Sequence, residues 1–127
     1  DYVVIDNEAG LEHLSRRTTR DVDVLFIVSD PSMRGLVAAA RVAELLDELK
    51  TAVGATYLIV NRATGPSLSE PLQKIIDEHK LKLAAILPAD AAVNELDALG
   101  EPIVKLPADA PMRRSLETML AALDGGL

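Results

Sequence analysis

Near its start the chain carries the run Val3-Val4-Ile5-Asp6-Asn7-Glu8-Ala9-Gly10, and this stretch decides how the remainder is interpreted. Its three β-branched residues predict a short buried strand, and Asp6 stands where that strand ends. Ligands of open parallel α/β sheets bind beyond the carboxyl ends of the strands, so we expect Asp6 at the mouth of a site.

The same stretch has two interpretations. The carboxylate of Asp6 can hold the water shell of a magnesium ion, and Gly10 lets the backbone approach a phosphate and direct an N–H at it. On this interpretation the stretch is the acidic switch segment of a nucleoside triphosphatase. The alternative is a strand that ends in an ordinary Asp-Asn turn, and these eight residues alone do not separate the two.

Length and composition bound the fold. The chain has 127 residues, which suits one domain or a piece of a larger one. Hydrophobic residues make up 49% and aromatic residues only 2%, so the core must be aliphatic. There is no cysteine in the sequence, which excludes disulfides and thiolate metal sites within it.

Charge and hydropathy bound the partners. The formal net charge of -7 argues against bulk attraction to nucleic acid or to an anionic membrane. The scarcity of aromatic side chains also argues against base-stacking platforms. No apolar run approaches the ~20 residues that span a bilayer. We therefore expect a cytoplasmic protein with neither nucleic-acid nor membrane partners.

Apolar runs and helical periodicities alternate along the chain, which predicts a parallel sheet with right-handed crossovers in a single α/β layer system. Strands are expected at residues 3–5, 24–28, 57–60 and 83–87, with a short edge strand at 103–104. Helices are expected at about 32–50, 71–79, 91–99 and 110–123. Ser32 and Asp109 are the candidate N-caps of the first and last helices, Val53-Gly54-Ala55 is expected as a turn, and Gly100 as a helix stop.

Two segments that follow expected strands suit a purine. The side chain of Asn61 offers a donor and an acceptor that can match an adenine edge, and Arg62 can lie flat on the ring. The Pro88-Ala89-Asp90 loop can close the other face of the base and offer backbone polar groups. Taken singly, each segment is also explained by simple turn chemistry.

These residues, in this order, resemble a known family. The succession of strand–DxxAG, strand–SDPS–helix, strand–NR, strand–PxD, Gly-x-Pro and a final amphipathic helix resembles the deviant-Walker-A ATPases of the Min/Par type. The run from Asp6 through Leu11-Glu12-His13-Leu14-Ser15-Arg16-Arg17-Thr18 looks most like the nickel-insertion accessory ATPases of carbon monoxide dehydrogenase. The resemblance covers essentially the whole chain but only the carboxyl-terminal half of such a protein.

The resemblance implies a three-layer P-loop NTPase-like (Rossmann-like) fold, left incomplete here because the amino-terminal half is missing, with residues 1–127 as part of one ATPase domain. It implies that Asp6 holds Mg²⁺ through water and that Gly10 faces the γ-phosphate through its N–H, the two positions we assign to catalysis. It further implies that Asn61, Arg62, Pro88, Ala89 and Asp90 surround the base of ATP or ADP. The expected partners are a second copy of the chain, in a nucleotide-switched dimer, and carbon monoxide dehydrogenase.

The chain departs from the family in two respects. No Gly-rich phosphate loop of the form GxxxxGK[ST] occurs in it, and the Cys-x-Cys pair that carries nickel in the maturation subgroup would lie upstream of its first residue. We therefore expect this segment alone to be inactive and the full-length protein to be the ATPase.

Alternatives remain at this point. A Min/Par-type positioning ATPase shares most of these motifs. A non-enzymatic, receiver-like module would use Asp6 as an acidic residue and Lys105 with Pro107 as a distant pair, although the third strand of the present chain ends in Asn61-Arg62 instead of an acid. Glu8 could position a water and His13 could contact a partner, but both also fit a plain solvated surface.

Overall fold

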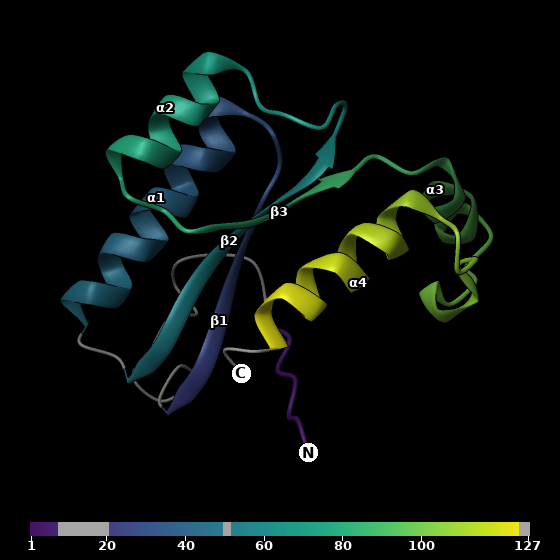
Figure 1. The fold of residues 1–127 in the computed structure, drawn as a ribbon, viewed down its shortest axis with the longest axis horizontal. Helices are drawn as coiled ribbons and strands as arrows, with labels where there is room; N and C mark the ends of the chain where they lie inside the picture. The colour runs from purple at the N-terminus through teal and green to yellow at the C-terminus, as the bar shows by residue number, and fades with distance from the viewer. Residues whose placement is uncertain (8–20, 50–51, 125–127) are drawn as a thin grey trace.

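The structure is a computed structural model that describes residues 1–7, 21–49 and 52–124. In these residues three parallel strands form one sheet in the order β1-β2-β3, with helices on both faces (Figure 1). The elements are β1 (Val22–Ser29), α1 (Met33–Glu48), β2 (Val53–Ala63), α2 (Glu70–Glu78), β3 (Leu83–Pro88), α3 (Ala91–Ala98), the 3-10 helix η2 (Ile103–Lys105) and α4 (Pro111–Asp124). The predicted three-layer α/β class is confirmed.

The main core lies between the sheet and the pair α1 and α2. Leu36 of α1 and Val60 of β2 are both 0% exposed, and they pack in one cluster with Leu58, Ile75 and Ile76. These side chains come from the helical stripe of α1 and α2 and from one face of β2, so the burial follows the expected periodicities. The aliphatic core predicted from composition is therefore present.

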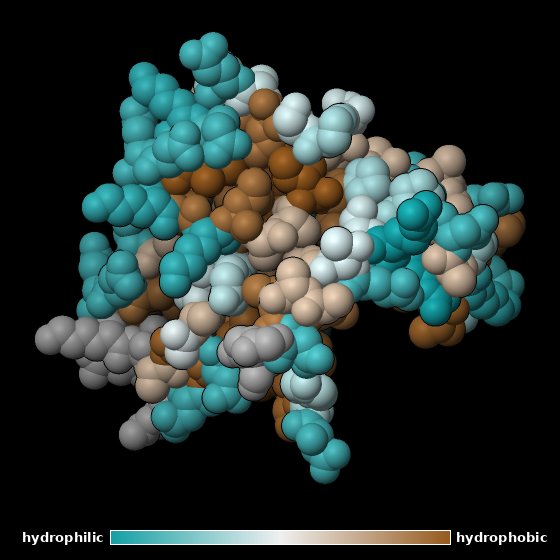
Figure 2. Space-filling view, viewed as in Figure 1, coloured by the Kyte–Doolittle hydropathy of each residue, from teal (hydrophilic) through white to brown (hydrophobic). Residues whose placement is uncertain are grey.

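Among the described residues, helix α4 covers the opposite face of the sheet. Met119 packs with Ile59 and Leu87, and Met112 lies at the border of this second cluster, so both methionines have the core role expected from their spacing. Helix α4 lies over β3 and leaves Phe26 and Val28 of β1 exposed. Figure 2 shows apolar surface between α2 and α4, where β3 runs in the same view of Figure 1.

The helix ends agree with most of the predicted signals. Ser32 is the N-cap of α1, and its Oγ accepts a hydrogen bond from the Gly35 N–H at 3.0 Å. Gly100 follows α3 with a φ of 66°, the left-handed conformation in which glycine has no steric penalty. No helix in the described part of the chain is long and apolar enough to cross a membrane.

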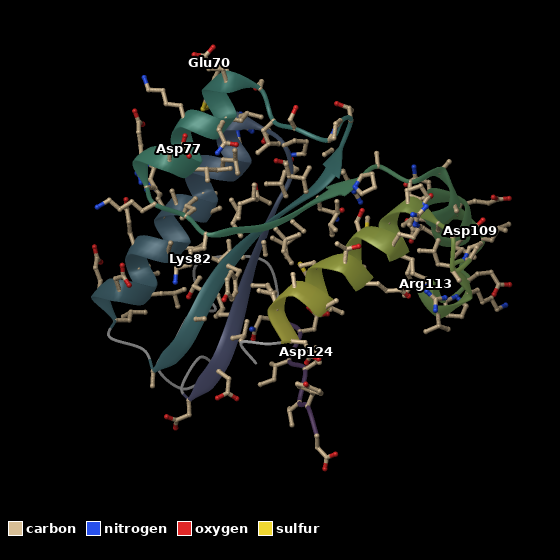
Figure 3. All side chains as sticks on the ribbon, in the orientation of Figure 1. Glu70, Asp77, Lys82, Asp109, Arg113 and Asp124 are labelled. Carbon is tan, nitrogen blue, oxygen red and sulfur yellow. The ribbon has the colours of Figure 1, made fainter. Side chains whose placement is uncertain are left out.

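The strand predicted at residues 3–5 is wrong. Residues 1–7 have no regular secondary structure, and Val3, Val4 and Ile5 are 88%, 92% and 61% exposed. A strand is stabilised by hydrogen bonds to a neighbouring strand, and the sheet described here does not include this segment. Tyr2 instead donates a hydrogen bond to Asp124 Oδ1 at 3.3 Å. Figure 3 shows Asp124 at the last turn of α4.

Further predictions require correction. Strand β2 begins at Val53 and ends at Ala63. The expected turn at 53–55 lies inside it because Val53 and Ala55 pair with β1, and the Asn61-Arg62 pair lies inside it because pairing with β3 resumes at Ala63. The expected edge strand at 103–104 is the 3-10 helix η2. The side chain that caps α4 is Asp90 and not Asp109, since the Met112 N–H donates to Asp90 Oδ2 at 3.0 Å.

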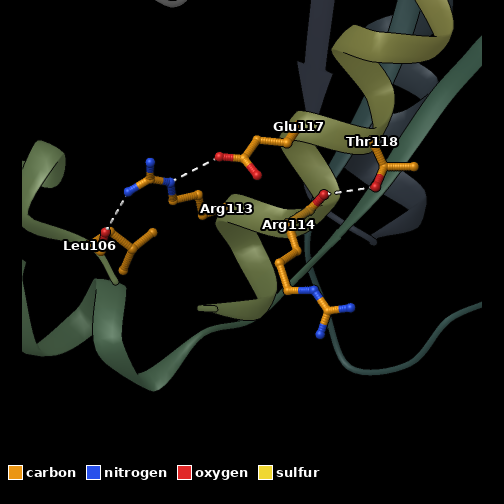
Figure 4. A network of polar contacts seen from close by, with 5 residues as sticks. All are labelled: Leu106, Arg113, Arg114, Glu117 and Thr118. Carbon is orange, nitrogen blue, oxygen red and sulfur yellow. Dashed lines mark hydrogen bonds and ion pairs between the residues drawn. The ribbon is translucent and has the colours of Figure 1, made fainter. Parts of the chain in front are cut away.

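A polar network holds the loop before α4 against that helix (Figure 4). The Arg113 guanidinium donates to the Leu106 carbonyl at 3.1 Å and to Glu117 Oε1 at 3.0 Å. One turn further on, Thr118 Oγ1 donates to the Arg114 carbonyl at 2.9 Å. Arg113 therefore joins η2 to α4, and it fixes the approach to the helix that covers β3.

Candidate functional site

The carboxyl end of β2 contains a β-bulge at the predicted Asn61-Arg62 pair. The register pairs Val60 with Ile86 and then Ala63 with Pro88, so β2 has one residue more than β3 between these two points. Bulges bend a strand and re-aim its side chains, and they are over-represented next to active sites. The pair was predicted to follow the strand as a turn, and no local pattern predicted the bulge.

The bulge contains a strained residue. Arg62 has a φ of 60°, which places a long, non-glycine side chain in the left-handed region. That conformation costs about 1–2 kcal/mol for an L-residue. Strain of this kind is concentrated at functional sites, where the surrounding structure holds it in place. Here the Arg62 N–H donates to the side-chain Oδ1 of Asn61 at 2.9 Å, and this bond stabilises the backbone of Arg62 and the side chain of Asn61 together.

The loop after β3 is tied to the same bulge. The Ala89 N–H donates to the carbonyl of Ala63 at 2.9 Å, which extends the pairing of β2 and β3 beyond Pro88. Asp90 then ends the loop as the N-cap of α3. The backbone thus holds the 61–63 and 88–90 segments side by side, as expected for the carboxyl ends of adjacent parallel strands.

The five predicted base-binding residues lie on the wall of one hollow of about 600 Å³. Its wall includes Asn61, Arg62, Pro88, Ala89 and Asp90, together with residues of α3, Ile103 of η2 and Met112 of α4. The sequence indicated the residues of this wall that follow β2 and β3, and it did not indicate the polar residues Asn94, Asp97 and Glu101. The residues that α3 and α4 add to the wall depend on how those helices pack, and no local sequence motif predicts them.

The side chains on this wall differ in how they are engaged. Among the described residues, Asn61 makes one side-chain hydrogen bond, in which its Oδ1 accepts the Arg62 N–H, so its amide N–H₂ donors and a second lone pair on Oδ1 have no partner there. Asp90 is 8% exposed, and its two carboxylate oxygens accept backbone N–H groups from Ala92 and Met112. Asn61 can therefore form hydrogen bonds with a base edge, whereas the carboxylate of Asp90 is already hydrogen-bonded to the first turns of α3 and α4.

A second predicted segment lies at the same end of the sheet. Ser29 is paired in register with Val60, so the residues that follow it lie next to the Asn61 bulge. In this segment Ser32 Oγ donates to Asp30 Oδ1 at 2.5 Å and also caps α1. Gly35 is packed against them, because a Cβ added there would lie 2.2 Å from Asp30 Oδ1. The capping role expected for this segment is confirmed for Ser32.

The structure does not bring Asp6 to this hollow. Figure 1 shows the amino-terminal segment near the last turn of α4, away from the carboxyl ends of β2 and β3, and Asp6 is exposed. Gly10, Glu8 and His13 lie outside the described residues. In the described ranges, no group of three or more acidic or histidine side chains converges as a metal site.

Another hollow, of about 540 Å³, lies between β3 and α4. Ala84, Arg114 and Thr118 are among its lining residues, and none of the predicted site residues contributes to it. The predicted base-binding residues therefore line the 600 Å³ hollow and not this one.

Comparison with known proteins shows which group of proteins this chain resembles. An uncharacterized ATP-binding protein of Methanocaldococcus jannaschii is 38% identical over 117 residues, which are 92% of this chain and 46% of that protein. The MinD cell division protein of Aquifex aeolicus has a similar structure, with a TM-score of 0.64 and 28% identity over 81% of this chain and 44% of that one. This chain is a relative of the Min/Par-type ATPases.

A finer likeness is also present. The carbon monoxide dehydrogenase accessory protein CooC of Rhodospirillum rubrum is 33% identical over 99 residues, which are 77% of this chain and 36% of that protein. No family model matches the chain. The chain spans less than half the length of these Min/Par-type relatives, and the resemblance drawn from its motifs is confirmed at the level of that group.

Proposed function

We propose that this chain supplies the base-binding side of an ATP site in a Min/Par-type ATPase, and that residues 1–127 are part of one such domain. One observation carries the proposal: Asn61, Arg62 and the 88–90 loop, which are far apart in sequence, line a single hollow at the carboxyl end of the sheet. The ATP-binding relative from Methanocaldococcus jannaschii supports the choice of nucleotide.

The chemistry of the hollow suits adenine. The Asn61 amide offers a donor and an acceptor together, which is the pattern of the adenine N6–N7 edge. Arg62 supplies a planar guanidinium that can stack on the ring, and Pro88 supplies an apolar surface from the opposite segment. The bulge and the hydrogen bond from the Arg62 N–H hold the Asn61 side chain before any ligand arrives, which lowers the entropy cost of binding.

The phosphates would be handled elsewhere in the protein. The chain carries no GxxxxGK[ST] motif, which is the usual phosphate-binding loop. Under this proposal the hollow holds the base, and other residues of the protein make most of the phosphate contacts. Under this proposal Asp6 holds magnesium through water and Gly10 faces the γ-phosphate, the roles that the resemblance implies. The isolated segment would then bind ATP weakly and would not hydrolyse it.

For the biological role, we propose nickel insertion into carbon monoxide dehydrogenase by a nucleotide-switched dimer. The motif at residues 6–18 and the accessory-protein relative from Rhodospirillum rubrum support this role. A Min/Par-type positioning role is the second candidate, because the MinD structure of Aquifex aeolicus has a similar fold. Nickel binding by the whole protein, measured with and without ATP, would favour the first role, and its absence would favour the second.

The base-binding proposal is tested by calorimetric titration of the whole protein that contains this chain with Mg·ADP and Mg·GDP. Asn61→Ala should weaken Mg·ADP binding by roughly tenfold or more, because one base-reading hydrogen-bonding group is lost. The matched control is Gln73→Ala, which removes a similar amide from the exposed surface of α2, where its Nε2 donates to Asp77 at 3.0 Å.

The expected pattern is a loss of adenine preference in Asn61→Ala and unchanged binding in Gln73→Ala. Equal affinities of the wild type and Asn61→Ala for Mg·ADP would show that the hollow is not the base pocket. A wild-type protein with no affinity for either nucleotide would exclude the ATPase function altogether.

A further inference from the structure

We infer that Asp90 is a positioning residue, which fixes the starts of two helices at once and thereby sets the spacing of the walls of the nucleotide pocket. This inference rests on the proposed function of that pocket. Asp90 Oδ1 accepts the Ala92 N–H at 2.9 Å, and Asp90 Oδ2 accepts the Met112 N–H at 3.0 Å. One carboxylate thus joins the first turn of α3 to the first turn of α4, across 22 residues of sequence.

The choice of residue type follows from these two bonds. An ionised aspartate has two oxygens and only accepts hydrogen bonds, so it satisfies two backbone N–H groups that point at it from different helices. Asparagine would present a donor to one of them, and serine has a single oxygen. Ser32 provides a comparison within the same chain, because its Oγ caps α1 alone.

The position of Asp90 connects this bond pair to the pocket. Asp90 ends the loop whose Ala89 N–H is held by the Ala63 carbonyl, one residue after the strained Arg62. Beyond Asp90, α3 and Met112 form the opposite wall of the hollow. The Ala89–Ala63 hydrogen bond therefore connects the bulge to the loop, and the carboxylate of Asp90 connects the loop to both helices.

Asp90 and the base-contacting residues therefore have different roles in the pocket. Asp90 is 8% exposed and its oxygens are directed at backbone amides, so it acts on the ligand through the placement of α3 and α4 and not by touching the base. If only the bond to Met112 were lost, Asp90 would still cap α3, but α4 would no longer be hydrogen-bonded to the 88–90 loop. Nucleotide affinity should then fall, because a smaller fraction of the molecules would have the pocket in the conformation that binds the nucleotide.

Two substitutions in the whole protein separate this role from simple helix capping. Asp90→Ser keeps one oxygen for the Ala92 N–H and loses the bond to Met112, whereas Asp90→Ala loses both. We expect Asp90→Ser to weaken Mg·ADP binding about tenfold, close to the effect of Asp90→Ala, because the competent fraction of the pocket falls by that factor. Amide hydrogen exchange should become faster at Met112 and stay slow at Ala92 in Asp90→Ser.

Controls keep the outcomes separate. Ile75→Val thins the core between α1 and α2, away from the pocket, and should lower stability without changing Mg·ADP affinity. Wild-type affinity in Asp90→Ser with fast exchange at Met112 would overturn the positioning role. An Asn61→Ala variant with unchanged affinity would instead reject the pocket itself, whatever Asp90 does.

A measurement on the wild-type protein covers the case in which the Asp90 variants do not fold. Saturation with Mg·ADP should slow amide exchange at Ala92 and Met112 together, because one carboxylate holds both. Slower exchange at Ala92 with no change at Met112 would contradict the inference.

Discussion

The carboxyl end of β2 and the amino-terminal segment 1–7 have similar sequences and very different structures. Each has a short run of β-branched residues followed by a polar pair, Ile59-Val60-Asn61-Arg62 in one and Val4-Ile5-Asp6-Asn7 in the other. Val60 is completely buried, whereas Val4 is 92% exposed. The run in β2 has a hydrogen-bonded strand on each side, and the run at 3–5 has none in the described sheet.

This difference explains which predicted site residues come together. Polar residues that follow paired strands are carried to a common edge, and the 61–62 and 88–90 segments meet there. Asp6 follows an unpaired run and lies on an exposed segment away from that edge. In the described sheet, the strand-end residues that meet at one edge are therefore those whose strands have neighbours.

The largest expected effect contrasts two valines, one from each region. Val60→Ala should lower the free energy of unfolding by about 2–3 kcal/mol, because it removes two methyl groups from a fully packed cluster. Val4→Ala should change it by less than about 0.5 kcal/mol, as is usual for an exposed side chain. Urea denaturation measures both variants. Equal losses would mean that segment 1–7 packs as tightly as β2.

An intermediate effect tests how closely the carboxyl edge is packed. Gly35→Ala places a Cβ 2.2 Å from Asp30 Oδ1 and 2.7 Å from Ser29 Oγ, so it should cost roughly 1–2 kcal/mol of stability. Gly65→Ala is the control, because no atom lies within 4 Å of the added Cβ. Thermal unfolding of the two variants should show a lower midpoint only for Gly35→Ala. An unchanged midpoint there would mean that the 29–35 segment adjusts freely.

The smallest expected effect compares two helix starts on the same side of the sheet. Ser32→Ala should lower stability by about 1 kcal/mol, because it removes the side-chain acceptor of the Gly35 N–H. Ser69 occupies the N-cap of α2 without a side-chain hydrogen bond, so Ser69→Ala should change stability by less than about 0.5 kcal/mol. Circular dichroism during denaturation measures the pair, and similar losses in both would remove the special role of the 29–35 segment.

Much of the fold follows from local patterns. The four α-helices lie within a few residues of their predicted bounds, because amphipathic periodicity and signals such as Ser32 and Gly100 act over a single turn. The predictions that failed concern pairing. The segment 53–55 is strand because β1 lies beside it, and 103–104 forms a 3-10 helix outside the three-stranded sheet of the described residues.

The candidate site divides in the same way. Asn61, Arg62 and the 88–90 loop were recognisable because their side chains have useful chemistry and follow apolar runs. The bulge, the positive φ of Arg62 and the bond from Asp90 to Met112 were not recognisable. Each depends on the register of two strands or on the packing of two helices that are distant in sequence.

By itself the sequence determined the α/β class, the helix positions, the aliphatic core and the residue types at the base pocket, because these depend on side-chain periodicity and local chemistry. Only the tertiary structure decided that residues 3–5 stand outside the sheet, that Asn61 lies in a bulge and that Asp90 serves two helices. The physical reason is that hydrogen bonds across strands and between helix ends need a partner at a set distance, and a linear pattern does not specify that partner.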